Sequence, residues 1–462
     1  MPGKYRAYPE YKDSGVEWLG EIPNHWQIAE LKRYSFVKGG YAFSSDSFIE
    51  DGEPVIRISD IKQDGSVSLK NCKCVSGELA NKYSEFSVSS GELVMAMTGA
   101  TIGKAGWFRG GKPALVNQRV GVFKCNDRYL DYRFFWYLLS SCGYQEHIQL
   151  TAFGGAQPNI SDAGMVGYKT AIPAIEEQEK IANFLDHETA KINTLIEKQQ
   201  QLIQLLKEKR LAVISHAVTK GLNPNAPMRD SGVEWLGEVP EHWKVISLKR
   251  LARKITDGEH ISPTFTDEGM PFLSAKDIRD RTIDYEVNKY VTLEDGYRFR
   301  RRCNPEVDDI LIVSRGATIG RVGLVERKII FCLLGSVILL KPKTTTVDPV
   351  FVYYLLNQYS AKEQFFLASQ ASAQQAIYLV DVAELLIALP SLPEQIEIRN
   401  HLEGQIKKID NLIQVSEKAI KLIQERRTAL ISAAVTGKID VRSWQSPEPF
   451  YNYKETNMEA IA

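Results

Sequence analysis

The sequence Asp13-Ser14-Gly15-Val16-Glu17-Trp18-Leu19-Gly20-Glu21 returns letter for letter as Asp230-Ser231-Gly232-Val233-Glu234-Trp235-Leu236-Gly237-Glu238. Two shorter stretches recur at the same offset of 217 residues: G-A-T-I-G at 99–103 and 316–320, and A-V-T at 217–219 and 434–436. The constant offset predicts two copies of one unit with no net insertion between the matched blocks. Because such copies fold alike, we expect a pseudo-two-fold internal repeat.

Length and composition favour a soluble protein with several cores. The chain has 462 residues, of which 44% are apolar, but its longest apolar run, 331–340, is interrupted by Gly335 and Ser336. It is therefore too short to cross a membrane, and the first residues lack the apolar stretch of a signal peptide. We expect a cytoplasmic protein with no membrane partner. The six cysteines form no C-x-x-C pair and the seven histidines are scattered, so no metal site is predicted.

Each copy has the same internal order. A short segment with two tryptophans is followed by a body of about 140 residues, in which strand-like runs alternate with turns and helix-like aromatic stretches. A long polar-apolar stretch then ends the copy. The expected class is α+β. We predict an N-terminal segment with a first body at 1–170, a first spacer region at 171–227, a second body at 228–387, a second spacer region at 388–444, and a C-terminal tail at 445–462.

The spacer regions carry the periodicity of long amphipathic helices. After Pro173 and Pro390, apolar residues fall at intervals of three and four, which predicts helices around 176–215 and 394–433, each about 35 residues or 50 Å long. Such helices either pack on their own body or pair with each other, and the length favours an antiparallel, coiled-coil pair with polar Gln199 and Ser416 in the stripe. The residues expected to hold the pair together and to dock other subunits are Ile192, Leu195, Ile196, Leu202, Leu206, Ile409, Leu412, Ile413, Ile420 and Ile423.

The repeated glycine-rich turn is not a nucleotide site. Its spacing in copy one is G-x-x-x-G-K followed by Ala105, whereas a phosphate loop needs one more residue and then Ser or Thr. A turn after a buried strand fits better. The twin positions Lys104 and Arg321 both keep a positive charge, which favours contact with phosphate, although a plain hairpin would look the same.

No self-contained catalytic centre is predicted. Asp309, Glu326 and Lys328 fit a loose nuclease pattern, but Glu326 and Lys328 correspond to Arg109 and Gly111 in copy one. A metal-dependent nuclease therefore remains a minor alternative. We expect neither catalytic residues nor a bound metal.

Polar recognition chemistry remains. Side-chain amides and guanidinium groups hydrogen-bond the edges of bases, and Lys and Arg contact phosphates. The formal net charge is zero, so any basic surface must be local. Segments 66–83 and 283–300 hardly resemble each other, as expected if two bodies recognise two different half-sites. The candidate DNA-binding residues are Tyr41, Arg57, Lys62, Lys104, Asn117, Gln118, Arg119, Gln157 and Asn159 in copy one, and Lys276, Arg279, Arg300, Arg301, Arg315, Arg321, Gln374 and Gln375 in copy two.

Taken together, the motifs resemble those of the DNA-specificity subunits of type I restriction-modification systems. The resemblance covers both copies and rests on the doubled D-S-G-V-E-W-L-G-E-[IV]-P-x-H-W segment, G-G-Y-A-F at 39–43, the doubled G-A-T-I-G, and the E-Q pairs at 177–178 and 394–395. It implies two target-recognition domains separated by two long antiparallel helices. Each domain would bind one half of a split double-stranded DNA target. The predicted helix length of about 50 Å leads us to expect the two halves about one helical turn apart.

The resemblance also implies partners. Two methyltransferase (modification) subunits would dock on the helices, and restriction (translocase) subunits would join them. S-adenosylmethionine, ATP and Mg²⁺ would be bound by those partners and none by this chain. A coiled-coil scaffold for other proteins is the competing interpretation, but it leaves two divergent bodies rich in Asn, Gln and Arg unexplained.

Overall fold

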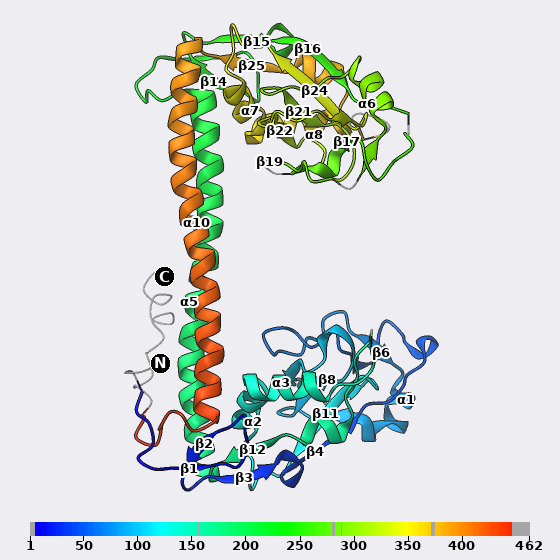
Figure 1. Cartoon of the computed structure of the whole chain (residues 1–462), viewed down its shortest axis with the longest axis vertical. Helices are drawn as coiled ribbons and strands as arrows, with labels where there is room; N and C mark the ends of the chain where they lie inside the picture. The colour runs from blue at the N-terminus through cyan, green and yellow to red at the C-terminus, as the bar shows by residue number, and fades with distance from the viewer. Residues whose placement is uncertain are drawn as a thin grey trace, which may run out of the picture. The chain divides into compact units, whose positions relative to one another are not determined.

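The chain forms two compact units, and each contains parts of both copies. The computed structural model describes residues 5–155, 157–261, 263–279, 282–287, 289–370 and 375–445. Unit 1 consists of residues 1–199 together with 418–462, and unit 2 of residues 200–417 (Figure 1). Copy two therefore supplies the end of its long helix to unit 1, and copy one supplies the end of its long helix to unit 2.

The doubled segment is a β-hairpin. In copy one it joins β1 (Tyr11–Asp13) to β2 (Glu21–Pro23), and in copy two it joins β13 (Met228–Asp230) to β14 (Glu238–Pro240), both antiparallel. The turn needs a positive φ at Gly15 and Gly20, of 64° and 63°, and the same holds for Gly232 and Gly237, at 71° and 59°. Side chains are disfavoured in this backbone conformation, which explains why the glycines recur.

The body of unit 1 consists of two four-stranded sheets, a two-stranded sheet and short helices. One sheet has the order β4 (Ser35–Gly39), β11 (Val120–Cys125), β8 (Leu93–Ala96), β9 (Ala105–Trp107). The second has the order β6 (Lys73–Val75), β5 (Glu53–Ile56), β10 (Ala114–Val116), β7 (Ser87–Val88). Strand β3 (Gln27–Glu30) pairs with β12 (Lys169–Ile172). The helices are α1 (Gly77–Lys82), α2 (Tyr132–Leu139), α3 (Cys142–Thr151) and α4 (Asp162–Val166).

The body of unit 2 repeats this plan. Its main sheet has the order β16 (Ala252–Asp257), β24 (Val337–Pro342), β21 (Ile310–Val313), β22 (Val322–Leu324). A second sheet has the order β20 (Tyr290–Val291), β17 (Met270–Leu273), β23 (Cys332–Leu333), and two pairs join β18 (Ile278–Arg279) to β19 (Thr282–Ile283) and β15 (Lys244–Ser247) to β25 (Leu386–Leu389). The helices are α6 (Leu293–Arg300), α7 (Pro349–Asn357), α8 (Tyr359–Gln370) and α9 (Leu379–Glu384). The α+β class and the internal repeat are confirmed.

Two long helices end the copies: α5 (Ile175–Lys220), with 46 residues, and α10 (Leu392–Val435), with 44 residues. Both are longer than the periodicity predicted. The expected spacer boundaries at 171 and 388 fall within β12 and β25, because each body is closed by a strand before the proline and helix begin. None of the described helices is long and apolar enough to span a membrane.

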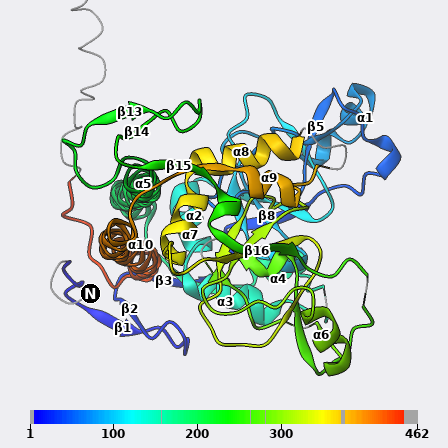
Figure 2. The same ribbon diagram turned by 90° about the horizontal axis from the view of Figure 1, so that it is seen from above.

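The two helices run antiparallel, as expected. In unit 2, Leu206 of α5 packs with Ile409 and Ile413 of α10, and one turn further on the guanidinium of Arg210 lies 3.6 Å from the carboxylate of Asp410. In unit 1, Ile192 of α5 belongs to the core that also contains the last turns of α10. Figures 1 and 2 show the helices side by side.

The packed seam is narrower than predicted. Ile192, Leu206, Ile409 and Ile413 are buried and Ile196, Ile420 and Ile423 are partly buried, but Leu195, Leu202 and Leu412 are 51%, 42% and 53% exposed. The expectation that these three leucines hold the pair together is wrong. At a turn of about 100° per residue, Leu195 and Leu202 lie about 60° and 80° from the line through Ile192, at the edge of the stripe. Ser416, predicted as a polar interruption, is buried.

The repeated glutamate at the start of each long helix ties the hairpin to that helix. In unit 1 the Glu177 carboxylate accepts hydrogen bonds from Trp26 Nε1 at 3.3 Å and Tyr8 Oη at 2.6 Å, and lies 2.8 Å from His25 Nε2. In unit 2, Glu394 makes the same contacts with the indole and imidazole of the second H-W pair, both at 3.0 Å. Sequence inspection found this motif but not its role.

The glutamine that follows ties the body to the same helix. Gln178 is fully buried. Its Oε1 accepts the N–H of Asp131 at 2.9 Å, and its Nε2 donates to the carbonyls of Tyr129 and Pro173, both at 2.9 Å. Gln395 makes the equivalent bonds at the start of α7 and to Pro390. We call these Glu-Gln pairs, 177–178 and 394–395, the junctions.

Each unit is completed by the helix end of the other copy. In unit 1, Tyr11 Oη donates to the Gly437 carbonyl at 3.1 Å, and Lys438 Nζ donates to the Glu21 carbonyl at 2.6 Å. In unit 2, Gly221 after α5 lies so close to Trp243 that an added Cβ would be 3.3 Å from the indole. Ala217 and Val218 in the last turn of α5, and Ala434 and Val435 at the end of α10, are buried.

Candidate nucleic-acid interface

Three loops and one strand end form a continuous rim on unit 1. Backbone hydrogen bonds connect them: Gln118 N donates to Tyr41 O at 2.9 Å, Met97 N to Arg119 O at 2.9 Å, and Gly99 N to Pro158 O at 2.8 Å. We call residues 41, 97–103, 117–119 and 157–159 rim 1. It brings together six of the predicted residues, namely Tyr41, Asn117, Gln118, Arg119, Gln157 and Asn159.

The side chains of rim 1 present mixed donors and acceptors. Gln118, Arg119 and Gln157 are exposed. The amide of Asn159 is oriented by a 2.9 Å hydrogen bond from Nδ2 to the Gln157 carbonyl. The ring of Tyr41 stacks on that of Tyr83 with centroids 3.8 Å apart, and its hydroxyl donates to the Tyr83 hydroxyl at 2.8 Å, which raises the pKa of Tyr41. Rim 1 can therefore bond several base edges.

Of the basic candidates of copy one, Arg57 and Lys104 adjoin rim 1. Arg57 directly follows Ile56, whose carbonyl accepts the N–H of Asn117, and Arg57 Nε lies 3.7 Å from the buried carboxylate of Asp60. Lys62 is exposed and donates to the Ser59 carbonyl at 3.0 Å. Lys104 ends the glycine-rich turn and is half-exposed.

Unit 2 has a rim that repeats the backbone bonds of Tyr41 and of Met97. Glu259 N donates to Leu333 O at 2.7 Å and Gly335 N donates to Glu259 O at 2.7 Å, matching the bonds made by Tyr41. A β-bulge between Ala252 and Lys254 inserts one residue into β16, so the offset here is 218. The offset of 217 still holds in the matched blocks, but in this segment it is shifted by one, and the residue in the place of Tyr41 is Glu259.

The rest of this second rim follows the original offset. Ser314 N donates to Ser336 O at 2.9 Å, and Arg315 forms a bridge with Ala376, as Thr98 does with Asn159. We call residues 259, 314–320, 334–336 and 375–376 rim 2. Arg315 is exposed and helps line a pocket of about 280 Å³ that also includes Gly335 and Tyr378.

The two rims differ in side chains. Asn117, Gln118 and Arg119 of rim 1 are replaced by Leu334, Gly335 and Ser336 in rim 2. Of the two glutamines predicted for copy two, Gln374 lies outside the described residues. Gln375 is exposed, in a left-handed conformation with φ of 48°.

The remaining candidates of copy two are dispersed over the body. Arg279 pairs with Asp284 at 2.5 Å, and the Arg300 guanidinium donates to the Phe331 carbonyl at 2.7 Å, tying α6 to the residue before β23. Arg298 and Arg302 also pair with carboxylates, of Asp295 and Asp257. Arg298, Arg300 and Arg302 are therefore all engaged in contacts within unit 2. Lys276 and Arg301 are exposed, and Arg321 occupies the place of Lys104.

Asp309, the central residue of the nuclease alternative, belongs to a repeated ion pair. It is 1% exposed, and its carboxylate lies 2.6 Å from Lys341 Nζ. Burial raises the pKa of Asp309, whereas Lys341 lowers that of nearby Glu306. Copy one has the same pair, Glu92 with Lys124, also at 2.6 Å. Glu326 and Lys328 lie exposed on a loop, and among the described residues no three metal-binding side chains gather.

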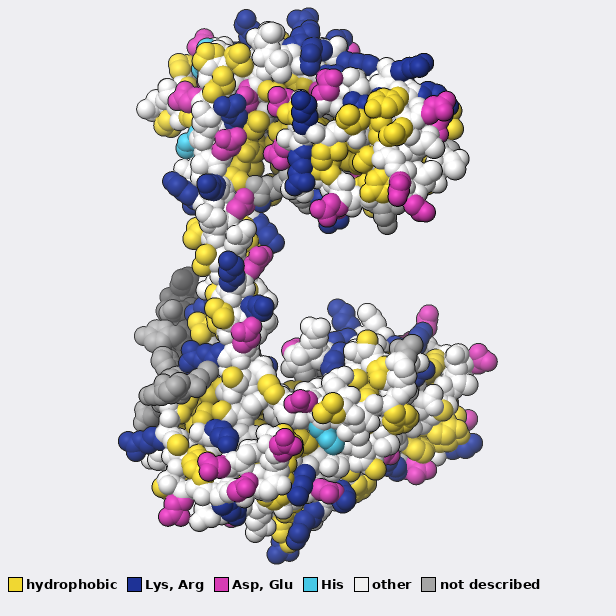
Figure 3. Space-filling model, viewed as in Figure 1, with side chains coloured by type: hydrophobic (Ala, Val, Ile, Leu, Met, Phe, Trp, Pro, Cys, Tyr) yellow, Lys and Arg dark blue, Asp and Glu magenta, His cyan; other side chains and the backbone are white. Residues whose placement is uncertain are grey.

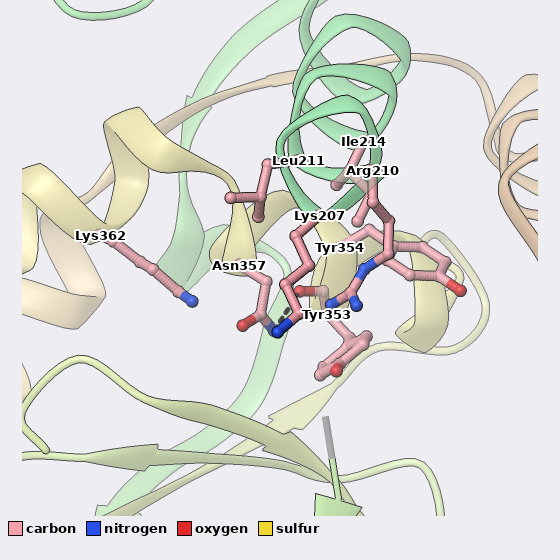
Figure 4. Close-up of a pocket in the computed structure, with 8 residues that line it drawn as sticks. All are labelled: Lys207, Arg210, Leu211, Ile214, Tyr353, Tyr354, Asn357 and Lys362. Atoms are coloured by element: carbon pink, nitrogen blue, oxygen red, sulfur yellow. Dashed lines mark hydrogen bonds between the residues drawn. The ribbon is translucent and has the colours of Figure 1, made fainter. Parts of the chain in front are cut away.

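Charge is finely mixed on the visible surface. On the face in Figure 3, basic and acidic side chains are interspersed over both units. A further pocket, of about 490 Å³, lies in unit 2 between α5, α7 and α8 (Figure 4). Its lining includes Lys207, Tyr354 and Lys362, and within it Asn357 donates to the Tyr353 carbonyl at 3.0 Å.

Comparison with known proteins agrees with this geometry. The family model of the type I restriction modification DNA specificity domain matches residues 23–205 and again 240–422. The chain belongs to this family. It is 25% identical to the type I restriction enzyme EcoBI specificity subunit of Escherichia coli, over 95% of this chain and 91% of the relative. It is 24% identical to the putative MjaX specificity subunit of Methanocaldococcus jannaschii, over 92% and 96%.

One solved structure shares the fold. A chain from a study of complex assembly and conformational transition of the type I R-M system superimposes with a TM-score of 0.66 at 16% identity, covering 90% of this chain and 99% of its own length. The protein is thus a DNA sequence-specificity subunit with two specificity domains. Specificity subunits are non-catalytic, bind DNA and work with modification and restriction subunits. This decides against the scaffold and nuclease interpretations.

Proposed function

We propose that the two units recognise the two unlike halves of one bipartite DNA target, rim 1 one half and rim 2 the other. The observation that carries this is the contrast between equal backbones and unequal side chains in the rims. Arg119 and Gln157 have the chemistry to bond guanine and adenine edges bidentately, while Lys104 and Arg321 suit phosphates. The predicted base contact of Gln374 also stays part of this proposal.

The test uses the chain assembled with its modification subunits in cells. Methylated adenines are mapped genome-wide for the wild type, for Arg119→Ala and Gln157→Ala, and for Arg315→Ala. Variants in rim 1 should relax one half of the methylated sequence, and Arg315→Ala should relax only the other half. A continuous target, or one half altered by variants in both rims, would refute the proposal.

We further propose that α5 and α10 dock two modification subunits, to which restriction subunits are added. Leu195, Leu202 and Leu412 support this, because these large apolar side chains are exposed on helices whose seam is filled by other residues. The double variant Leu195→Asp with Leu412→Asp should keep the fold and lose co-purification with the modification subunit. Lys198→Asp, another charge change on α5, serves as the control. Unchanged assembly would place the contact elsewhere.

We propose that S-adenosylmethionine, ATP and Mg²⁺ bind to the partner subunits and not to this chain, and that the complex is cytoplasmic. The purified chain alone should then leave DNA unmodified in their presence. Isothermal titration of each cofactor into the chain, with the assembled complex as the positive control, measures this directly. Heat of binding to the chain alone would contradict the assignment.

A further inference from the structure

Glu259 stands at the position in rim 2 that Tyr41 holds in rim 1. Three backbone bonds establish the match. Two are the Glu259 bonds to Leu333 and Gly335, and the third is Gly258 N to Val337 O, which corresponds to Gly40 N to Val120 O. In both copies the preceding glycine lies against a backbone that an added Cβ would meet at 2.2 Å. Sequence alignment at a constant offset would pair Tyr41 with Gly258, so the bulge hides this equivalence.

The Glu259 side chain is held in one orientation. Its Oε1 accepts the N–H groups of His260 at 2.9 Å and Ile261 at 3.2 Å, while the carboxylate is only partly buried. His260 is fixed in turn: its Nε2 lies 2.7 Å from Asp257, and its ring occupies the space where Gly335 would carry a Cβ. In rim 1 the residue equivalent to Gly335 is Gln118. The His260 ring therefore fills the space of a side chain that Gly335 lacks.

A carboxylate at this position cannot serve as a phosphate contact, because like charges repel. It suits a hydrogen-bond donor on a base edge, and the major groove offers two amino donors, cytosine N4 and adenine N6. Adenine presents the acceptor N7 beside its amino group, which would face the second carboxylate oxygen. Cytosine presents a C–H there, so the carboxylate selects cytosine.

We propose that Glu259 is a specificity-determining residue of rim 2 that accepts a hydrogen bond from a cytosine amino group in the second half-site. This rests on the proposed function of the rims. The ordering of Oε1 by two backbone N–H groups means that little side-chain freedom is lost on binding.

The test is the methylation map of the assembled complex carrying Glu259→Gln. The glutamine keeps an amide oxygen for the two N–H groups, so the loop is preserved. Its NH2 group then faces the base, where it cannot accept a hydrogen bond from the cytosine amino group but can donate one to adenine N7. At one position of the second half-site, preference for cytosine over adenine should fall about 10- to 100-fold or reverse. The matched control is Glu268→Gln, an exposed glutamate in the same connection between β16 and β17.

The outcomes separate this inference from the proposal beneath it. Tyr41→Ala is mapped in parallel. If Tyr41→Ala relaxes the first half while Glu259→Gln changes nothing, changes a position other than cytosine, or abolishes methylation, then Glu259 only orders its loop and the inference fails alone. If neither variant alters either half, the assignment of the rims to DNA reading fails as well.

Discussion

The junctions and the rims are repeated in opposite ways. At the junctions, Glu177 and Gln178 make the same side-chain bonds as Glu394 and Gln395. At the rims, the backbone bonds recur while the side chains change. Side-chain bonds fix residue identity, whereas backbone bonds leave it free. The chain can therefore hold one architecture while the side chains of the rims vary.

The largest loss of stability is expected for the repeated ion pair between a lysine and a carboxylate, which is more deeply buried in copy two than in copy one. Lys341→Met leaves Asp309 buried without its partner and should cost unit 2 about 3–5 kcal/mol. Lys124→Met should cost unit 1 less than half of this, since the Lys124 and Glu92 side chains are 27% and 16% exposed against 8% and 2% for Lys341 and Asp309. Denaturant titration measures the free energy of unfolding of each variant, and hydrogen exchange assigns the loss to unit 1 or unit 2.

The loss of stability in Lys341→Met should depend on pH. The pKa of Asp309 is already raised by burial, and removal of Lys341 takes away the positive charge that opposes this rise. A carboxyl with a raised folded-state pKa gains stability on protonation. The deficit of Lys341→Met should therefore shrink as the pH falls from 7 toward about 5. A deficit that stays constant or grows on acidification would contradict this role of Asp309.

The junctions should respond equally to equal changes. Gln178→Leu and Gln395→Leu each leave a buried backbone N–H without its acceptor, at a cost of about 2–3 kcal/mol in either unit. Gln204→Leu, at an exposed site on α5, should be close to neutral. Unequal losses would mean that the repeated hydrogen bonds contribute unequally to the stability of the two units. That result would weaken the contrast with the rims.

The rims should respond separately. Arg119→Ala and Gln157→Ala should each cost about 1–3 kcal/mol of discrimination in the first half-site and leave stability unchanged. Gln374→Ala should affect only the second half. Competition binding of the assembled complex to targets mutated in one half resolves the two effects.

The smallest effect on folding is expected at the edge of the helix seam. Leu195→Ala should cost under about 1 kcal/mol, because half of the side chain is already in water. Ile192→Ala, one turn away in the seam, should cost about 2–4 kcal/mol. Similar losses at both positions would show that Leu195 packs in the assembled protein.

Much of the fold could be predicted from the repeats. The internal repeat, the α+β bodies and the antiparallel helices follow from matched blocks and apolar periodicity, whereas the β-hairpin of the doubled segment was not predicted. The exposed leucines were misplaced because a stripe with intervals of three and four is wider than the line of contact between two helices. The boundaries at 171 and 388 missed the last strands, since a four-residue strand before a proline leaves only a weak pattern.

The structure brings most candidate residues of copy one together and leaves most of those of copy two dispersed. Asn117, Gln118, Arg119, Gln157 and Asn159 stand out by composition, and the loops bring them together. In rim 2 the position of Glu259 depends on a single inserted residue at Ala252–Lys254, which leaves no signal in composition. Arg300 was a candidate for phosphate binding, but its guanidinium donates to the Phe331 carbonyl. The sequence alone does not show this bond, because only the tertiary structure brings the two residues together.

Each unit is completed by the helix end of the other copy, and this arrangement determines what a single copy would lack. A chain with only one copy would have a hairpin and body lacking the A-V-T helix end that completes a unit, and would carry that helix end with nowhere of its own to dock. Two such chains would satisfy each other by swapping these ends. The present chain joins two such copies covalently, so the side chains of rim 1 and rim 2 can differ within one molecule.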